Sequence, residues 1–203
     1  MIDAQDVALI VEGGGMRNSY TAPAIVRLIE QVKFGWVGGV SAGAVHALNY
    51  ASADVRRARA AFTELASHPH FGGVLKLARG KGYFNSEFLY GQAEQLLPFD
   101  FATFAASSTQ VHVEAMRADT GDTVSWGRDD FLRDPSLVAR AARASSTVPK
   151  VMPITLIDAA PYVDGALGTS GGLLIDAARR AGFTRFVVLA TRPRDYWKKP
   201  LVQ

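Results

Sequence analysis

The 203-residue sequence contains no cysteine, which excludes a disulfide framework, a thiolate metal site and a cysteine nucleophile. No run approaches the roughly 18 uninterrupted apolar residues of a membrane-spanning helix, and residues 1–6 lack the basic and apolar segments of a secretion signal. Repeats and low-complexity linkers are also absent. Apolar residues make up 48% of the chain and charged residues 20%, as in ordinary globular proteins. The sequence therefore predicts a single soluble domain, which we expect in the cytoplasm.

Acidic residues are scarce near the C-terminus. Residues 179–203 hold seven basic residues and one acidic residue, whereas residues 1–178 hold 15 basic and 18 acidic residues. The formal net charge of +3 therefore comes from the last eighth of the chain. Such a segment is typical of a solvated surface or of a connection to further sequence, and peripheral contact with an anionic membrane is the functional alternative. We expect no nucleic-acid partner.

Short apolar runs alternate with stretches of helical periodicity, which indicates an α/β fold with a mainly parallel central sheet. The expected strands are residues 7–11, 36–40, a hairpin of 111–115 with 124–126, the pair 154–157 and 162–163, and a buried strand at 186–190. The expected helices are residues 21–31, 42–50, 54–66, 135–143 with Asp134 as N-cap, and 173–181. Residues 72–97 fit neither pattern.

A serine nucleophile is predicted at Gly39-Val40-Ser41-Ala42-Gly43, which matches the nucleophile-elbow pattern G-x-S-x-G. The pattern is short, and a second match occurs at 168–172, around Ser170. An elbow requires a strand before the serine, a helix after it and small flanking residues. Ser41 has this context, whereas Ser170 follows a loop-like segment. The alternative role for Ser41 is that of an N-cap.

The run Gly13-Gly14-Gly15-Met16-Arg17 directly follows the first expected strand. Consecutive glycines leave backbone N–H groups unobstructed, so they can hold a phosphate or a developing oxyanion. The run matches neither a P-loop nor a complete dinucleotide fingerprint. Residues 7–40 form one expected right-handed βαβ unit, which brings both strand ends to the same edge of the sheet and the glycines beside Ser41. An ordinary tight turn is the alternative.

A base for Ser41 is harder to identify. The Ser…Asp…His order of α/β-hydrolases cannot be met through Asp164, because all four histidines precede it: His46, His68, His70 and His112. His46 follows Ser41 by five positions on the same expected helix, so it points away from Ser41. A carboxylate must then act directly, and Asp164 in Asp164-Gly165-Ala166 is the candidate. A hairpin turn is the alternative role for this pair.

In this order, the glycine run, the Ser41 elbow and Asp164-Gly165-Ala166 resemble the motifs of the patatin-like phospholipase family. The run Ala144-Ser145-Ser146-Thr147-Val148-Pro149, with Pro153 after it, looks like the family segment that leads to its catalytic aspartate. The resemblance extends from about residue 7 to residue 194. It implies a three-layer α/β/α fold and hydrolysis of lipid or other acyl esters without a metal or cofactor.

The resemblance also implies a role for each matched residue. Ser41 becomes the nucleophile and Asp164 its base, while Gly13, Gly14 and Gly15 form the oxyanion hole with Arg17 beside them. Asn18 and the run Gly168-Thr169-Ser170 depart from the family pattern, which leaves the substrate class open. The alternatives to hydrolysis are a catalytically silent module that binds lipid or a partner, and an acyltransferase. Because no helix follows the last expected strand, we expect residues 1–203 to be the catalytic part of a longer protein.

Overall fold

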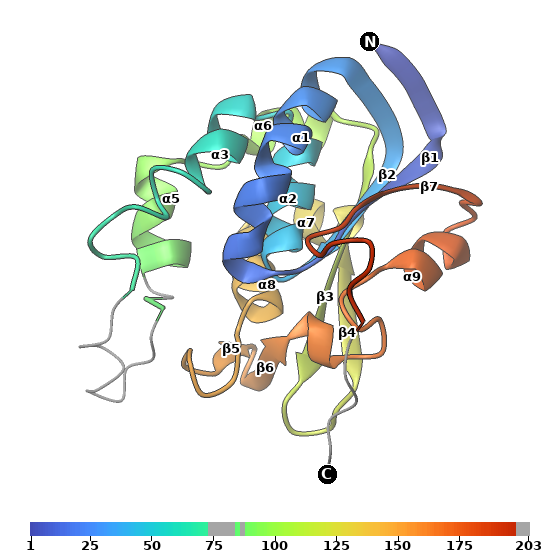
Figure 1. Ribbon diagram of the computed structural model, residues 1–203. Helices are drawn as coiled ribbons and strands as arrows, with labels where there is room; N and C mark the ends of the chain where they lie inside the picture. Colours follow the sequence, from blue (N-terminus) through green and yellow to red (C-terminus); the bar gives the residue numbers. More distant parts are fainter. Residues whose placement is uncertain (73–83, 86–87, 198–203) are drawn as a thin grey trace.

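The computed structural model describes residues 1–72, 84–85 and 88–197, and within them the strands form one mixed sheet (Figure 1). The sheet order is β5-β6-β3-β2-β1-β7, and β4 pairs with β3 outside this path. β1, β2, β3 and β7 are mutually parallel, whereas β4, β5 and β6 join by antiparallel pairing. The strands are β1 (Ile2–Val11), β2 (Val32–Val40), β3 (Gln110–Arg117), β4 (Thr123–Gly127), β5 (Thr155–Ile157), β6 (Ala160–Asp164) and β7 (Arg185–Leu189).

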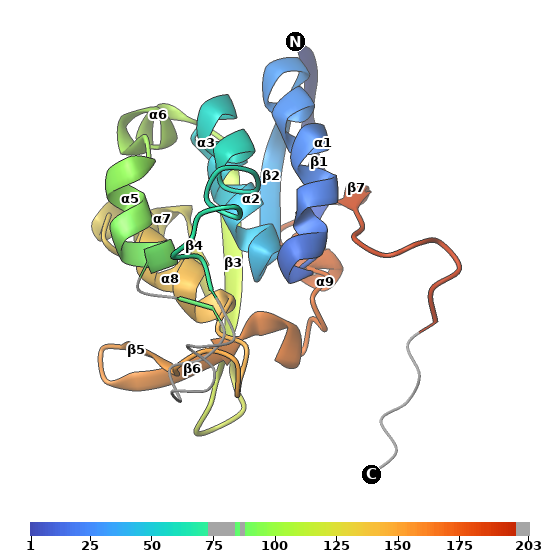
Figure 2. The same cartoon turned by 60° about the vertical axis from the view of Figure 1, so that its left-hand side comes forward.

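Helices cover both faces of this sheet (Figures 1 and 2). They are α1 (Asn18–Gln31), α2 (Ala42–Ala51), α3 (Val55–Ala60), α5 (Ala93–Leu96), α6 (Phe101–Ala106), α7 (Arg128–Arg133), α8 (Leu137–Ser145) and α9 (Ile175–Arg180). Single turns of other helical types are η1 (Gly15–Arg17), η2 (Phe88–Gln92) and η3 (Gly165–Leu167). No helix in the part of the chain that the structure describes combines the length and apolar content needed to cross a membrane.

The alternation of side chains along β1 builds two separate cores. Leu9 and Val11 pack into a large apolar cluster with residues of α1, α2 and α8, while Ala8 and Ile10 pack with α9 on the other face. This arrangement follows from the two-residue period of a strand, which sends consecutive side chains to opposite faces. Both faces are therefore apolar, as the continuous apolar run at 7–11 indicates. The expected three-layer α/β/α fold is confirmed.

Several expected elements differ in extent. The prediction of a helix over 54–66 is wrong for its second half, because α3 ends at Ala60 and residues 61–67 form turns. Ending the helix there lets the Phe62 ring stack on His46, with centroids 4.1 Å apart. The segment 72–97 lies partly outside the described residues, and its described part contains η2 and α5.

Two further expectations are corrected at element ends. α8 begins at Leu137 rather than at residue 135, and its N-cap is Ser136 rather than Asp134. Asp134 instead accepts the Ser136 N–H at 3.0 Å in a turn before the helix. The expected buried strand at 186–190 is instead the half-exposed β7, in which Val188 is 41% exposed. β7 is an edge strand that pairs with β1 on one side, so its apolar sequence does not imply full burial.

Candidate active site

Ser41 lies in a strained turn between β2 and α2. Its φ of 57° and ψ of −132° fall outside the common regions for a non-glycine residue, and such strain costs about 1–3 kcal/mol. Strain of this kind is retained where the surrounding packing enforces it. Although Ser41 occupies the N-cap position of α2, its side chain makes no capping hydrogen bond. The hydroxyl is therefore left available to the space in front of the helix.

The residues that flank Ser41 must be small. A Cβ on Gly39 would lie 2.1 Å from the carbonyl oxygen of Gly43, and a Cβ on Gly43 would lie 2.3 Å from that of Val11. Both distances are too short for any side chain. The close approach of β1, β2 and the start of α2 therefore depends on these two glycines, which belong to the predicted elbow.

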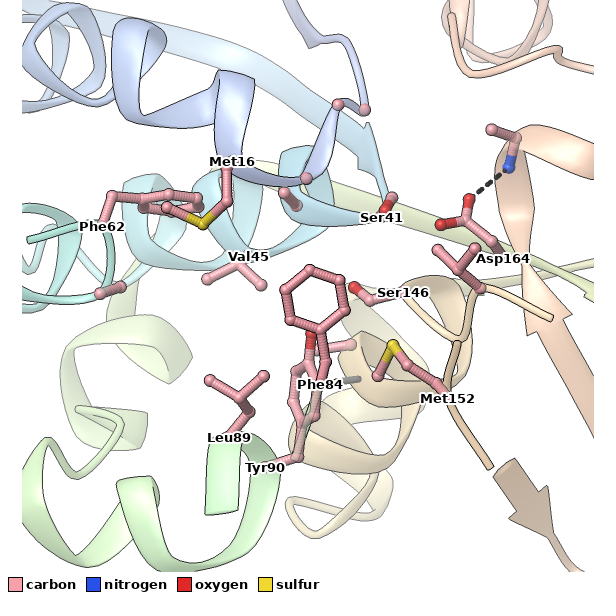
Figure 3. Close-up of a pocket in the computed structure, with 18 of the residues that line it drawn as sticks. Met16, Ser41, Val45, Phe62, Phe84, Leu89, Tyr90, Ser146, Met152 and Asp164 are labelled. Carbon is pink, nitrogen blue, oxygen red and sulfur yellow. Dashed lines mark hydrogen bonds between the residues drawn. The ribbon is translucent and has the colours of Figure 1, made fainter. Parts of the chain in front are cut away.

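Asp164 lies close to Ser41 because β3 pairs with both β2 and β6. The last residue of β2, Val40, pairs with Glu114, and Asp164 pairs with the next residue, Ala115. β2 and β6 both lie on the edge of β3 opposite β4, because β4 pairs with the same β3 residues as each of them. The ends of β2 and β6 consequently meet. Ser41 and Asp164 lie beside each other at this junction (Figure 3).

The environment of Asp164 makes its carboxylate a stronger base. The side chain is 6% exposed, and burial raises its pKa above the usual value; hydrogen bonds from Ser41 and from the Ala166 N–H oppose this shift. The Ala166 N–H donates to Oδ1 at 2.9 Å, which fixes the carboxylate orientation (Figure 3). The backbone N–H of Asp164 donates to the carbonyl oxygen of Thr147 at 2.8 Å. Burial thus favours proton uptake by this group.

The segment at the end of α8 holds both halves of this pair. Ser145 is fully buried, and its Oγ accepts a hydrogen bond of 2.8 Å from the Ser41 N–H, while Thr147 binds Asp164 as described above. Thr147 is in turn held by Thr155, with 2.6 Å between the two hydroxyl oxygens. The family resemblance points to this segment in the sequence but assigns no role to Ser145 or Thr147. A run of small hydroxyl residues at a helix end was the available signal.

The glycine run lies against Ser41, as the βαβ argument predicts. A Cβ on Gly13 would lie 3.2 Å from the Ser41 Cβ, so the two backbones are in contact. Gly15 has a φ of +55°, which a side chain would resist. Within the described residues, no hydrogen bond engages the N–H of Gly14 or Gly15. Arg17 is exposed beside the loop, and its Nε donates to Thr191 Oγ1 at 3.5 Å.

A cavity of about 500 Å³ opens in front of Ser41 and Asp164 (Figure 3). Its wall is mostly apolar and comes from α2, the segment after α3, α8 and the segment around η2. Wall residues shown in Figure 3 include Val45, Phe62, Phe84, Leu89 and Met152. A pocket of this size and polarity is typical of a site for a small apolar ligand or acyl chain.

No histidine lines this cavity within the described residues. His46 is fully buried on α2 and points to α1, where its Nε2 lies 3.0 Å from the carbonyl oxygen of Asn18. Burial lowers its pKa to about 4, while the bond to Asn18 opposes the shift, so His46 is neutral at pH 7. His112 pairs with Glu114 on the face of the sheet that carries α9.

The second G-x-S-x-G match has a different setting. Ser170 lies in a turn between η3 and α9, and its side chain is absent from the wall of the cavity. No strand leads directly into Ser170. Among the described residues, no group of three His, Asp or Glu side chains has the arrangement of a metal site.

Comparisons with known proteins place this arrangement in a family. The model of the patatin-like phospholipase family matches residues 9–176. A similar solved structure is that of VipD from Legionella pneumophila, at 12% sequence identity and a TM-score of 0.46, and the match covers 81% of this chain. The chain spans 45% of the length of that structure. No curated protein matches the sequence. Because the family model covers most of the chain, including the glycine run, the Ser41 elbow and Asp164, the protein belongs to the patatin-like phospholipase family, a group of lipid acyl hydrolases.

Proposed function

We propose that this protein hydrolyses carboxylic esters of lipids with a Ser41–Asp164 dyad. The observation that carries the proposal is the pairing of adjacent β3 residues with the ends of β2 and β6. This pairing supports a close approach of the strained Ser41 turn to the buried Asp164 carboxylate. A serine hydroxyl is a weak nucleophile until a neighbouring base accepts its proton. The hydrogen bond from Ser41 to Asp164 supports Asp164 as this base, and no histidine lines the described cavity wall.

The reaction proceeds through two acyl transfers. Ser41 Oγ bonds to the acyl carbon while its proton passes to Asp164. The bond to the leaving alcohol then breaks, the alcohol oxygen takes the proton from Asp164, and an acyl-Ser41 ester remains. Water attacks this ester and gives a proton to Asp164. The bond to Ser41 breaks, the Ser41 oxygen regains the proton, and the carboxylic acid leaves.

Both transfers pass through a tetrahedral oxyanion, and the glycine run supplies its donors. Gly14 and Gly15 line the same cavity as Ser41, and their N–H groups are free of hydrogen bonds to the described residues. Donors already aimed at the developing charge stabilise it without reorganisation, and loss of one typically costs about 10² to 10³ in kcat. Arg17 adds positive charge beside this loop.

The mouth of the cavity suits a lipid surface. Met16, Val148 and Leu167 line the cavity and are still 45%, 40% and 53% exposed, so they form an apolar rim. Arg17 directly follows Met16, and Lys150 lies two positions after Val148, so both positive charges are close to the rim in sequence. An apolar rim with basic neighbours favours peripheral contact with an anionic membrane, where an acyl chain can pass from the bilayer into the cavity.

Covalent labelling with a fluorophosphonate probe, measured by intact mass, tests the proposal. We expect one adduct on the wild type, none on Ser41→Ala, and normal labelling of Ser170→Ala, the matched control in the second motif. Labelling of Ser41→Ala would overturn the assignment. A wild type that binds lipid but is neither labelled nor active would instead be a silent binding module. Acylated product formed with an added alcohol or lysolipid would identify an acyltransferase.

A further inference from the structure

The residues after β7 turn back onto the glycine run. The parallel pairing of β1 and β7 sets Val11 opposite Leu189, so the chain leaving β7 meets the chain leaving β1. Thr191 is 9% exposed there, and its N–H donates to Glu12 Oε2 at 2.6 Å. Its hydroxyl donates to two acceptors that share its one hydrogen, the same carboxylate oxygen at 3.0 Å and the carbonyl oxygen of Gly13 at 3.1 Å.

Thr191 also contacts the next glycine of the run. A Cβ on Gly14 would lie 2.8 Å from Thr191 Oγ1, so the threonine side chain fills the space beside this backbone. Arg17 donates to the same hydroxyl oxygen from the other end of the loop. Glu12 is held in place as well, because Arg192 pairs with its second carboxylate oxygen at 3.6 Å and stacks on Tyr196.

The loop needs such support because glycines restrain the backbone little. Its local bonds engage the carbonyl oxygens of Gly14, from the Arg17 N–H, and of Glu12, from Asn18 Nδ2. Three consecutive glycines populate many backbone conformations, and the conformation used here includes a positive φ at Gly15. Among the described side chains, only that of Thr191 donates a hydrogen bond to a carbonyl oxygen of these glycines. Oxyanion donors lower a barrier only if they are already aimed before the charge develops.

We infer that Thr191, oriented by Glu12, is a positioning residue that holds the oxyanion loop in its active conformation. The inference rests on the proposed function and adds to it a residue from outside the family-model match. Thr191 touches no reacting atom, so its effect acts through the direction of the Gly14 and Gly15 N–H groups. A displacement of such donors by about 1 Å can cost roughly 10²-fold in rate.

Steady-state kinetics on a short-chain ester test this role. We expect Thr191→Val to lower kcat by about 10- to 100-fold with KM within about twofold of the wild type. Thr191→Ser keeps the hydroxyl and should restore most of kcat. The matched control is Thr109→Val. Thr109 is 5% exposed and donates to the Phe34 carbonyl oxygen at 3.0 Å, near the starts of β2 and β3 and so at the far end of β2 from Ser41. This control should retain kcat even if its melting temperature falls.

Amide hydrogen exchange supplies a readout that does not depend on activity. Peptides covering residues 12–17 should exchange faster in Thr191→Val than in the wild type, Thr191→Ser or Thr109→Val. Equal kcat in the wild type and Thr191→Val would overturn the inference, as would equal loss of kcat in Thr191→Val and Thr109→Val. If residues 12–17 exchange at the same rate in Thr191→Val and in the wild type, the inference is overturned, even if the wild type hydrolyses no ester. Failure of the proposed function is recognised separately, by the absence of a probe adduct on Ser41.

Discussion

Acid should destabilise the fold through His46, and the size of the effect follows from its surroundings. The ring is fully buried, stacks on Phe62 and bonds the Asn18 carbonyl oxygen through Nε2. Nδ1 is buried without a partner among the described residues, so a second proton would find no acceptor there. Burial accordingly lowers the pKa of His46 from 6.5 to about 4.

The direction of the effect is set by which state binds the proton first. The unfolded chain has the higher pKa, so it takes up a proton as the pH falls below 6.5 while the folded chain does not. Stability linked to His46 is therefore complete above pH 6.5 and is lost between pH 6.5 and 4. One pKa unit corresponds to about 1.4 kcal/mol, so the loss is about 3 kcal/mol, or roughly 6–12 °C in melting temperature for a chain of this size.

Thermal unfolding followed by circular dichroism between pH 7 and pH 4 measures this loss. His46→Gln keeps an N–H that can donate to the Asn18 carbonyl oxygen and removes the titration. We expect its melting temperature to be lower than that of the wild type at pH 7 and to fall much less on acidification. His70→Gln, at an exposed histidine, should follow the wild-type curve. Parallel curves for the wild type and His46→Gln would refute the reasoning.

Three further predictions concern the dyad, the elbow and the rim. Asp164→Asn should lower kcat by about 10² to 10⁴ and remove the acid limb of kcat/KM. The raised pKa of Asp164 means that its negative charge disfavours folding, so this variant should unfold at a higher urea concentration than the wild type at pH 7. The difference should shrink as the pH falls, because the wild-type carboxylate then takes up a proton. Gly43→Ala should lose about 1–3 kcal/mol or more in urea unfolding, whereas Gly127→Ala, whose Cβ would lie 3.6 Å from its nearest contact, should not. Leu167→Ser should bind anionic vesicles about tenfold more weakly in sedimentation, while Leu156→Ser, 64% exposed but outside the cavity wall, should bind normally.

Local features of the site follow from the sequence because they depend on short-range geometry. A strand ending in small residues and followed by a helix produces the Ser41 turn, and Gly39 and Gly43 are small because no side chain fits there. The position of the glycine run beside Ser41 also follows, since a right-handed βαβ unit leaves little choice about where its strand ends lie. His46 points away from the elbow because helical periodicity fixes its direction.

Only the tertiary structure decided what depends on pairing between distant segments. The sequence indicates that Asp164 ends a strand, but its meeting with Ser41 depends on adjacent residues of β3 pairing with β2 and β6, and no local pattern encodes that register. The hydrogen bonds from the α8 end to both residues depend on the same packing. Thr191 follows an apolar strand and has no local signal, because its partners lie about 180 residues earlier in the chain. The exposure of β7 was likewise decided by its place at the sheet edge, since an apolar sequence specifies a strand without specifying what covers it.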